Sequence, residues 1–484
     1  MSVTRRAFLQ GTALAGGGLV LPGLVGCVPE NGTGPSTASY LHGVASGDPD
    51  STSVVLWTRH EPVAGSTTPI PVTWEISTDP NFAQNAASGT ANADPSRDWT
   101  VKVIPGGLAP GTTYWYRFTS AAGRSPVGRT RTAPSGSVAR LRLGFASCSN
   151  YAEGYFHGYR HLANRTDLDA VVHLGDYIYE LGSGTRTVDP TTEAVTLADY
   201  RRRYAWHRRD ADLAEMHRQH PVICIWDDHE FANDPFVGGA NNHQPATEGP
   251  WATRVAAGLR AHAEWMPTRV ENDLAYRTVR YGNLATLVLA DRQRRFIAAQ
   301  PDDGDLYLGK AQFDWLDSTI STNTATWLVL GTQSPFGSIA PSMTGEGYGN
   351  RDRNRVLDRF LSAPAGNLVV ASGDFHKFRA LDIARTPSTY NATTGAGSTA
   401  VEFTVGSITS SGTTDATIGS QVRYTNGVSR GYAVMTLTPS LMQTDFYGFD
   451  DALKRVPNLP AERWLAGFRS SAGARHLSVA AAPA

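Results

Sequence analysis

The 484-residue sequence predicts two folded domains, an N-terminal all-β sandwich and a larger α/β layered domain. Between residues 40 and 135, short alternating or β-branched runs are separated by turn residues at the spacing of a sandwich. From residue 140 to residue 484, strands alternate with helical stretches, which is typical of an α/β layered domain. The apolar fraction of 41%, with 48 Gly and 28 Pro, fits a globular, loop-rich chain and not a disordered one.

The first 27 residues resemble a bacterial export signal. The run TRRAFLQ at 4–10 precedes an apolar, glycine-rich stretch, as in twin-arginine signals. The run LVGC at 24–27 resembles a lipobox, which would make Cys27 the acylated first residue of the mature protein; cleavage nearby without a lipid is the alternative. We therefore expect the twin-arginine translocase to export the chain to the periplasm or cell surface, with membrane contact only through a lipid anchor. Residues 28–39 form a Pro/Gly/Ser/Thr linker.

The composition excludes several other functions. The formal net charge is −1, so neither nucleic-acid binding nor a polybasic membrane surface is expected. Three cysteines, Cys27, Cys148 and Cys224, are too few for a disulfide scaffold, and Cys224 is expected to be a buried small hydrophobe. No other stretch is long and apolar enough to span a bilayer. We expect a monomer.

The β domain is expected to pack against the rest of the chain or to cover it as a lid, because no chemically distinctive residues converge within it. Its run LAPGTTYWYR at 108–117 resembles the late hairpin of fibronectin type III-like sandwiches. The predicted strands are 53–58, 71–77, 100–104, 113–119 and 128–132.

The α/β domain is expected to contain buried strands joined by helical stretches. An Arg-rich helical stretch at 197–217 is expected to present a solvated face. The predicted strands are 141–146, 170–174, 221–226, 286–290, 326–330, 367–371 and 401–405.

Several of these strands end in residue types that bind metals. A single acidic turn or a lone histidine is more often structural, but here the pattern recurs at the carboxyl ends of strands, where α/β sheets bind ligands. Thiolate, carboxylate, phenolate and imidazole groups together suit more than one metal. Tyrosine favours a trivalent ion such as Fe³⁺, whereas Asp and Asn oxygens suit Ca²⁺. The strand ends are SCSN at 147–150, GDYIY at 175–179, DDHE at 227–230, Asp291 and GDFH at 373–376.

Three of these segments carry a resemblance to a known family. With flanking runs, they resemble the PhoD-type alkaline phosphatases of the metallophosphatase superfamily over most of the mature chain. The resemblance implies a metallophosphatase domain built as a two-sheet β-sandwich flanked by helices. It also implies one Fe³⁺ with one or two Ca²⁺ and hydrolysis of phosphate mono- and diesters at alkaline pH. The matching runs are GDYIYE at 175–180, WDDHE at 226–230, SGDFH at 372–376, GVASGDP at 43–49, VVLWTR at 54–59, AEWMP at 263–267 and LGKAQFDWL at 308–316.

The resemblance also implies the ligands of the iron. Asp176 would bridge the metals, and Tyr179 would bind iron as a phenolate. Cys148 would supply the thiolate ligand, and His376 would complete the iron side.

The implied calcium ligands are Asp374 with Asp228 or Asn233. His229 occupies the position of a histidine near the leaving group. One departure from the family is ADRQRR at 290–295, where relatives tend to have Asp, a small residue and Arg, so a substrate contact is expected to differ there.

The expected chemistry is metal-assisted hydrolysis of phosphate esters by an activated water, with His229 and Asp176 as the catalytic residues. A supporting hydrogen bond is the alternative role for His229. Two alternative functions remain. One is a phosphodiesterase specialised for cell-wall polymers or phospholipid head groups. The other is an exported binding lipoprotein with an inactive α/β domain.

Overall fold

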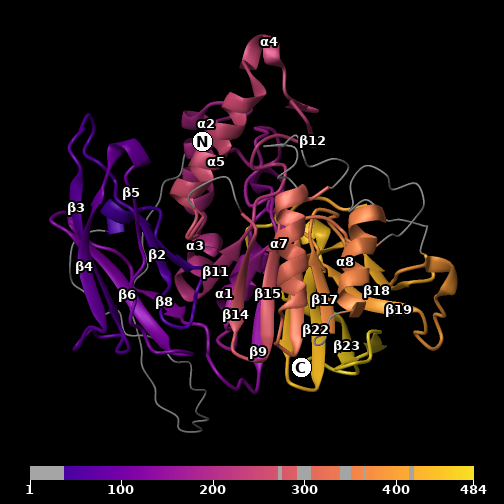
Figure 1. Cartoon of the computed structure of the whole chain (residues 1–484). Helices are drawn as coiled ribbons and strands as arrows, with labels where there is room; N and C mark the ends of the chain where they lie inside the picture. The colour runs from indigo at the N-terminus through magenta and orange to yellow at the C-terminus, as the bar shows by residue number, and fades with distance from the viewer. Residues whose placement is uncertain (1–36, 271–274, 292–306, 338–349, 363–366, 414–418) are drawn as a thin grey trace, which may run out of the picture. The chain divides into compact units, whose positions relative to one another are not determined.

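The computed structural model describes residues 37–270, 275–291, 307–337, 350–362, 367–413 and 419–484 (Figure 1). The expected signal with Cys27, and residues 292–295 of the departing segment, lie outside these ranges. Within the described residues, no helix combines the length and apolar character that a membrane crossing requires.

The larger sheet has ten strands, and its centre is built from three parallel strands that carry site residues at their carboxyl ends. These are β9 (Leu141–Ala146), β10 (Ala170–His173) and β11 (Pro221–Cys224), all completely buried. Antiparallel strands extend the sheet beyond β9, and β1 continues it beyond β11. The other strands are β21 (Ser429–Leu437), β22 (Leu441–Asp450), β23 (Arg463–Ser471), β24 (Ser478–Val479), β1 (Val44–Gly47), β2 (Val55–Arg59) and β5 (Thr100–Val103).

The second sheet has seven strands, four of which run parallel as neighbours: β15, β16, β17 and β19. Its strand β17 leads directly into the SGDFH run that carries two predicted ligands. The strands in spatial order are β14 (Arg277–Tyr281), β15 (Ala285–Ala290), β16 (Trp327–Thr332), β17 (Asn367–Ser372), β19 (Ser398–Thr404), β18 (Phe378–Ala384) and β20 (Val422–Asn426).

The two sheets pack face to face around one apolar core. Leu143 and Phe145 of β9 belong to the same buried cluster as Leu287 and Leu289 of β15. The alternate residue Val288 belongs to a second cluster on the outer face, as the two-residue repeat of a strand requires. The domain is therefore a two-sheet sandwich, as predicted.

Helices cover both outer faces of this sandwich. On the ten-stranded sheet they are α1 (His157–Ala163), α2 (Leu197–Arg208), α3 (Ala211–Gln219) and α5 (Trp251–Trp265), which share a core cluster with β10 and β11. On the seven-stranded sheet, α7 (Lys310–Ser321) shares a cluster with β15 and β16, as does α8 (Asn350–Ser362). Figure 1 shows α7 and α8 lying over the strands of the second sheet.

The N-terminal region differs from a self-contained sandwich. It does pack as two layers, because Leu56 of β2 and Val101 of β5 share a cluster with Val72 and Tyr116 of a smaller sheet. However, β2 and β5 are the edge of the ten-stranded sheet, joined to it through β1, which pairs in parallel with β11. The fibronectin type III-like topology and the domain boundaries stay predictions. The smaller sheet contains β3 (Ile70–Ser77), β4 (Ala87–Ala93), β6 (Thr113–Ser120), β7 (Gly123–Arg124) and β8 (Gly128–Arg131).

The Arg-rich stretch forms two helices, separated by Asp210, whose carboxylate caps the second. A solvated Arg face was expected, and this is right for Arg202, whose side chain is 53% exposed. It is wrong for Arg203 and Arg208, which are fully buried. Arg203 donates to five main-chain carbonyls, including that of Tyr179, because the connection after β10 turns back over α2 and needs donors for its carbonyl groups.

Candidate metal centre

Asp176 lies immediately beyond β10, where the backbone of β10 approaches that of β11. A Cβ added to Gly175 would lie 2.5 Å from the Cβ of Asp227, so only glycine fits there. The buried Glu230 carboxylate joins the two strand ends by accepting hydrogen bonds from the backbone N–H groups of Asp176 (3.1 Å), Tyr177 (2.7 Å) and Asp227 (2.7 Å). The position of Asp176 is thus fixed by the main chain on both sides.

Four of the predicted ligands have left-handed backbone conformations. The φ angles are 57° at Cys148, 55° at Asp176, 66° at Asp374 and 54° at His376. Such a conformation costs a non-glycine residue about 1–3 kcal/mol, and residues of this kind cluster at functional sites. The loops at three strand ends therefore hold residues in strained backbone conformations.

The first ligand group contains Cys148, Asp176 and His376, whose ligand atoms all lie within 4.8 Å of one another. Tyr179 belongs to the same place, since its O–H donates to Asp176 Oδ2 at 3.0 Å and lies 3.3 Å from His376 Nε2. Cys148 and Asp176 are buried, and Tyr179 is 4% exposed. The structure thus brings together all four residues that the sequence assigned to the iron side.

The second ligand group contains Asp176, Asp228 and His229, again with ligand atoms within 4.8 Å of one another. Asp176 therefore belongs to both groups, which is the geometry that a bridging carboxylate requires. Of the adjacent pair Asp227 and Asp228, it is Asp228 that enters the group.

Two further predicted ligands, Asn233 and Asp374, lie beside the two groups, and the Asp374 carboxylate belongs to neither. Asn233 is held beside the second group, because its backbone N–H donates to Glu180 Oε1 at 2.8 Å and its side-chain amide donates to Asp234. Asp374 is close enough to Cys148 to contribute to the raised pKa of that thiol, after burial and Asp176. Their roles as calcium ligands stay predictions.

The electrostatics of the first group favour a cation. Burial raises the pKa of Asp176 well above its usual range, and the neighbouring Asp228 raises it further. Burial likewise raises the pKa of Cys148 and that of Tyr179, with Asp176 adding to both. A cation among these groups reverses the effect, because it favours the deprotonated form of each. Asp176 Oδ1, which is buried and lacks a hydrogen-bond partner, is an acceptor that such a cation would satisfy.

His229 is oriented by a carboxylate that the sequence did not single out. Its Nδ1 lies 2.7 Å from Oε2 of Glu180, a fully buried residue, and its ring packs on that of Tyr179 with centroids 4.1 Å apart. Burial lowers the pKa of His229, but Glu180, Asp228 and Asp176 together raise it well above its usual value. The sequence signal for Glu180 is its place at the end of the GDYIYE run, directly after Tyr179.

Asp291 lies at the end of β15 but outside both ligand groups. Its carboxylate accepts hydrogen bonds from Trp226 Nε1 at 3.0 Å and from Gln333 Nε2 at 3.1 Å. A polar residue at a strand end therefore does not always belong to a ligand group. This side chain instead fixes the strand that leads into Asp227 and Asp228.

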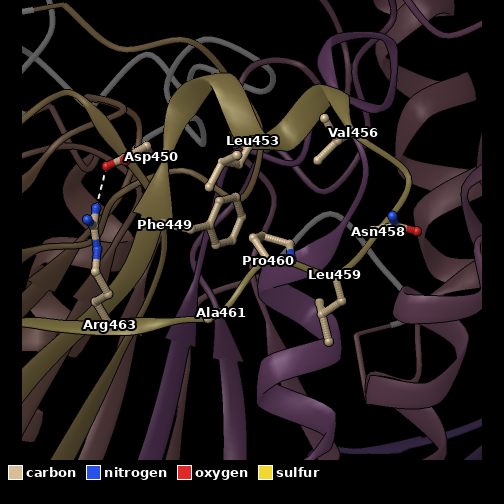
Figure 2. A pocket seen from close by; sticks show the side chains of 9 residues that line it. All are labelled: Phe449, Asp450, Leu453, Val456, Asn458, Leu459, Pro460, Ala461 and Arg463. Carbon is tan, nitrogen blue, oxygen red and sulfur yellow. Dashed lines mark hydrogen bonds and ion pairs between the residues drawn. The ribbon is translucent and has the colours of Figure 1, made fainter.

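A separate pocket of about 390 Å³ lies on the connection between β22 and β23 (Figure 2). Its lining is mainly apolar and includes Phe449, Leu453, Val456 and Leu459, and it contains none of the predicted ligands. The pocket is therefore separate from the predicted site.

A two-sheet sandwich flanked by helices, with Asp, His and Cys side chains converging at its strand ends, defines a class of phosphoesterases that work with bound metals. Two family models agree: PhoD-like phosphatase matches residues 143–446, and PhoD-like phosphatase, N-terminal domain, matches residues 26–134. The chain belongs to the PhoD-like phosphatase family, as the sequence motifs predicted.

Two relatives extend this result. The chain is 35% identical over 501 residues to alkaline phosphatase D of Bacillus subtilis (strain 168), an alignment that covers 91% of this chain and 84% of the relative. A solved structure of PhoD superposes with a TM-score of 0.82 at 31% identity and covers 93% of this chain and 94% of that one. The protein is therefore a phosphoric ester hydrolase, with phosphate esters as substrates.

Proposed function

We propose that the protein is a metal-dependent alkaline phosphatase and phosphodiesterase that holds one Fe³⁺ with one or two Ca²⁺. The observation that carries this proposal is that Asp176 belongs to both ligand groups. A carboxylate has two oxygen atoms and can serve two cations at once, whereas a purely structural acidic turn has no need of two converging sets of ligand atoms.

Cys148, Asp176, Tyr179 and His376 would hold the iron. The phenol of Tyr179 is the reason for choosing Fe³⁺, since its pKa is raised well above 10.0 by burial and only a strongly polarising ion would keep it deprotonated. When bound, the cations would withdraw charge from the phosphoryl oxygens and lower the pKa of a water molecule.

The calcium side would be Asp176 and Asp228 with Asn233 and Asp374. Oxygen atoms of this kind are the ligands that Ca²⁺ prefers. Asp228 is well placed because the backbone N–H of Asp234 donates to its Oδ2 at 2.9 Å, which orients the carboxylate.

His229 is the residue placed to handle a proton. With Nδ1 directed to Glu180, its Nε2 remains for the site, where it would pass a proton to the departing oxygen. Glu180 would hold the ring in this orientation throughout. Glu230 would maintain the backbone that presents Asp176.

A phosphodiesterase for substrates with apolar groups is the second candidate. It is favoured by a hairpin of β12 (Pro235–Phe236) and β13 (Gly239–Ala240), on which Phe236 is 53% exposed and Val237 61% exposed. The residues flanking this hairpin are tied to the site, because Asn233 N–H and the Asn242 side chain both donate to Glu180 Oε1. The apolar tip would meet the substrate on the His229 side, where phospholipid or lipid-linked leaving groups would depart.

The TRRAFLQ run, which resembles a twin-arginine signal, supports export to the periplasm or cell surface, and the LVGC run supports Cys27 as the lipidated residue. We also propose that the mature chain is a monomer. An exported binding lipoprotein with an inactive domain is less consistent with the chain, because the side chains of Cys148, Asp176, Tyr179 and His376 lie close together.

The test is the metal content of the purified protein, measured beside hydrolysis of a chromogenic phosphate monoester and a diester. We expect iron and calcium in the protein, loss of activity on chelation, and recovery when both ions are restored. Full activity after complete removal of metals would overturn the proposal. The second candidate is tested by comparing the hydrolysis rates of phosphodiesters that carry acyl chains with those of phosphodiesters that lack them. If this candidate is right, the double variant Phe236→Ser with Val237→Ser should lose its preference for acyl chains and keep its rate on the other diesters.

A further inference from the structure

A loop that follows β19 contacts all the predicted iron-side ligands except the bridging aspartate. We call residues 407–411, with the sequence SITSS, the serine loop. Ser410 Oγ lies 2.7 Å from the Tyr179 hydroxyl oxygen and 3.0 Å from the backbone carbonyl oxygen of Cys148. The backbone carbonyl of Ser411 lies 3.0 Å from His376 Nδ1. One short segment thus touches three ligand residues that are far apart in sequence.

The contact with His376 determines which ring nitrogen is available. A carbonyl can only accept, so His376 Nδ1 carries the proton and donates it to Ser411. Nε2 is then the nitrogen with the lone pair, and it is the one that lies near the Tyr179 oxygen. This orientation by a backbone carbonyl is the usual arrangement for histidines that bind metals.

Two buried cationic side chains hold the serine loop from behind. Arg430 Nη1 donates to Ser407 Oγ (2.6 Å), to the Ser410 carbonyl (2.7 Å) and to the His376 carbonyl (3.0 Å). Lys454 Nζ donates to the Thr409 carbonyl (2.7 Å) and to Ser411 Oγ (2.8 Å). Both residues are at most 1% exposed. Their geometry fixes both ends of the loop.

Two carboxylates complete this network. Asp451 lies 2.9 Å from both Arg430 Nε and Lys454 Nζ, and Glu153 lies 3.1 Å from Lys454 Nζ while accepting a hydrogen bond from Ser411 N–H at 2.9 Å. Burying two cations requires carboxylates and carbonyls around them, and those oxygens are supplied here by the loop and its neighbours.

Ser410 has the most direct contact with a ligand atom. A serine hydroxyl has one proton and two lone pairs, and Ser410 meets two oxygen atoms. A neutral Tyr179 donates its one proton to Asp176 and accepts from Ser410. A phenolate has no proton to donate, so the proton between these two oxygens still comes from Ser410. A hydrogen bond to the phenolate stabilises its electron pair.

We propose that the serine loop is a positioning element for the iron side of the site, and that Ser410 orients and electronically tunes the Tyr179 oxygen. This inference rests on the proposed function, since it concerns ligands of the proposed iron. Ser410 is a positioning residue and acts through Tyr179, while Arg430 and Lys454 hold the loop that carries it.

The test compares Ser410→Ala with wild-type protein, with Ser410→Thr, which restores the hydroxyl, and with Tyr179→Phe. The control is Ser77→Ala, which removes another buried serine hydroxyl in β3 whose hydrogen bond goes to the backbone carbonyl of Gln84. The readouts are iron per chain during titration with a chelator, the position of the visible absorption band, and the melting temperature.

We expect Ser410→Ala to hold iron about tenfold more weakly, which is the scale of losing a contact to a metal ligand. Its absorption band should move to longer wavelength, because the unsupported phenolate gives up an electron more easily. Ser410→Thr should return both values toward wild type, and Ser77→Ala should change neither. If Ser410→Ala keeps the wild-type band and iron affinity while Tyr179→Phe loses the band, the positioning role is refuted and the iron assignment stands. A wild-type protein that is iron-free and colourless but active would overturn both the positioning role and the iron assignment.

Discussion

The Glu180–His229 pair yields a prediction about the departing group. Glu180→Gln keeps the size of the side chain but removes its charge. The carbonyl oxygen of the amide can still accept from Asn233 N–H and Asn242, which leaves its NH₂ group facing His229 Nδ1. Two donors cannot share that contact, so His229 must carry its proton on Nε2 as a neutral ring or turn away. In either case the variant loses the charged proton donor.

The size of the effect follows from the contact that is lost. A hydrogen bond involving a charged group contributes about 1.5–3 kcal/mol. The distance of 2.7 Å and the complete burial of Glu180 place this bond at the strong end. If that energy is lost only in the transition state, the rate falls by roughly 10- to 100-fold.

The assay compares two monoesters by kcat. An alkyl phosphate needs a proton on its departing alkoxide, whereas a nitrophenyl phosphate releases a stable anion without one. We expect the full loss with the alkyl ester and little change with the nitrophenyl ester. Glu61→Gln is the matched control, because Glu61 Oε1 lies 2.9 Å from Nδ1 of the buried His42 in the N-terminal region. Equal losses on the two substrates would refute the proton-donor role of His229.

Three further predictions concern the bridge, acid stability and export. Asp176→Asn should abolish metal binding and nearly all activity with the fold retained, and a residual rate above about a tenth of wild type, a barrier change of only ~1.4 kcal/mol, would contradict bridging. Burial lowers the pKa of His173 in the folded protein to about 3, from its ordinary value of 6.5. Below pH 6.5 the unfolded chain therefore binds a proton at this histidine that the folded protein does not bind. The free energy of unfolding should therefore fall as the pH drops, by roughly 2 kcal/mol at pH 5 for this group. In urea unfolding of the metal-free proteins, the midpoint of His173→Gln should depend less on pH than that of the wild type. The double variant Arg5→Lys with Arg6→Lys should leave active enzyme in the cytoplasm. Cys27→Ser should release the exported enzyme from the membrane fraction, and a Cys27→Ser protein that stays membrane-bound would argue against lipidation.

The seven predicted strands of the α/β domain were recognisable because each is a buried apolar run, whereas others, including β21, β22 and β23 of the large sheet, were not predicted. The expected strand 141–146 coincides with β9 (Leu141–Ala146), and 367–371 lies within β17 (Asn367–Ser372). By contrast, β1 (Val44–Gly47) has only four residues with the sequence VASG, which gives no apolar alternation. Its role depends on pairing with β11 far along the chain, so local sequence could not show that the N-terminal strands continue the large sheet.

The candidate ligand residues could be selected by their type and by their place after strands, but the groups that contact and orient them could not. Ser410 lies 231 residues beyond Tyr179, and a serine in a Ser/Thr-rich loop has no distinctive pattern. Arg203 resembles a surface residue in sequence, yet it is buried beneath the connection after β10. Such contacts depend on tertiary packing, which overrides local preference.

The measurement that tests the central claim most directly is the visible absorption spectrum of the purified wild-type protein, with iron quantified per chain and turnover measured on the same sample. A phenolate and a thiolate bound to Fe³⁺ should give a charge-transfer band, and Tyr179→Phe should remove the phenolate contribution while the ring continues to pack. Cys148→Ser should shift the band and weaken iron retention, because a hydroxyl is a poorer partner than a thiolate. We predict a coloured protein whose activity follows its iron content. A colourless, iron-free protein with full activity would contradict the account.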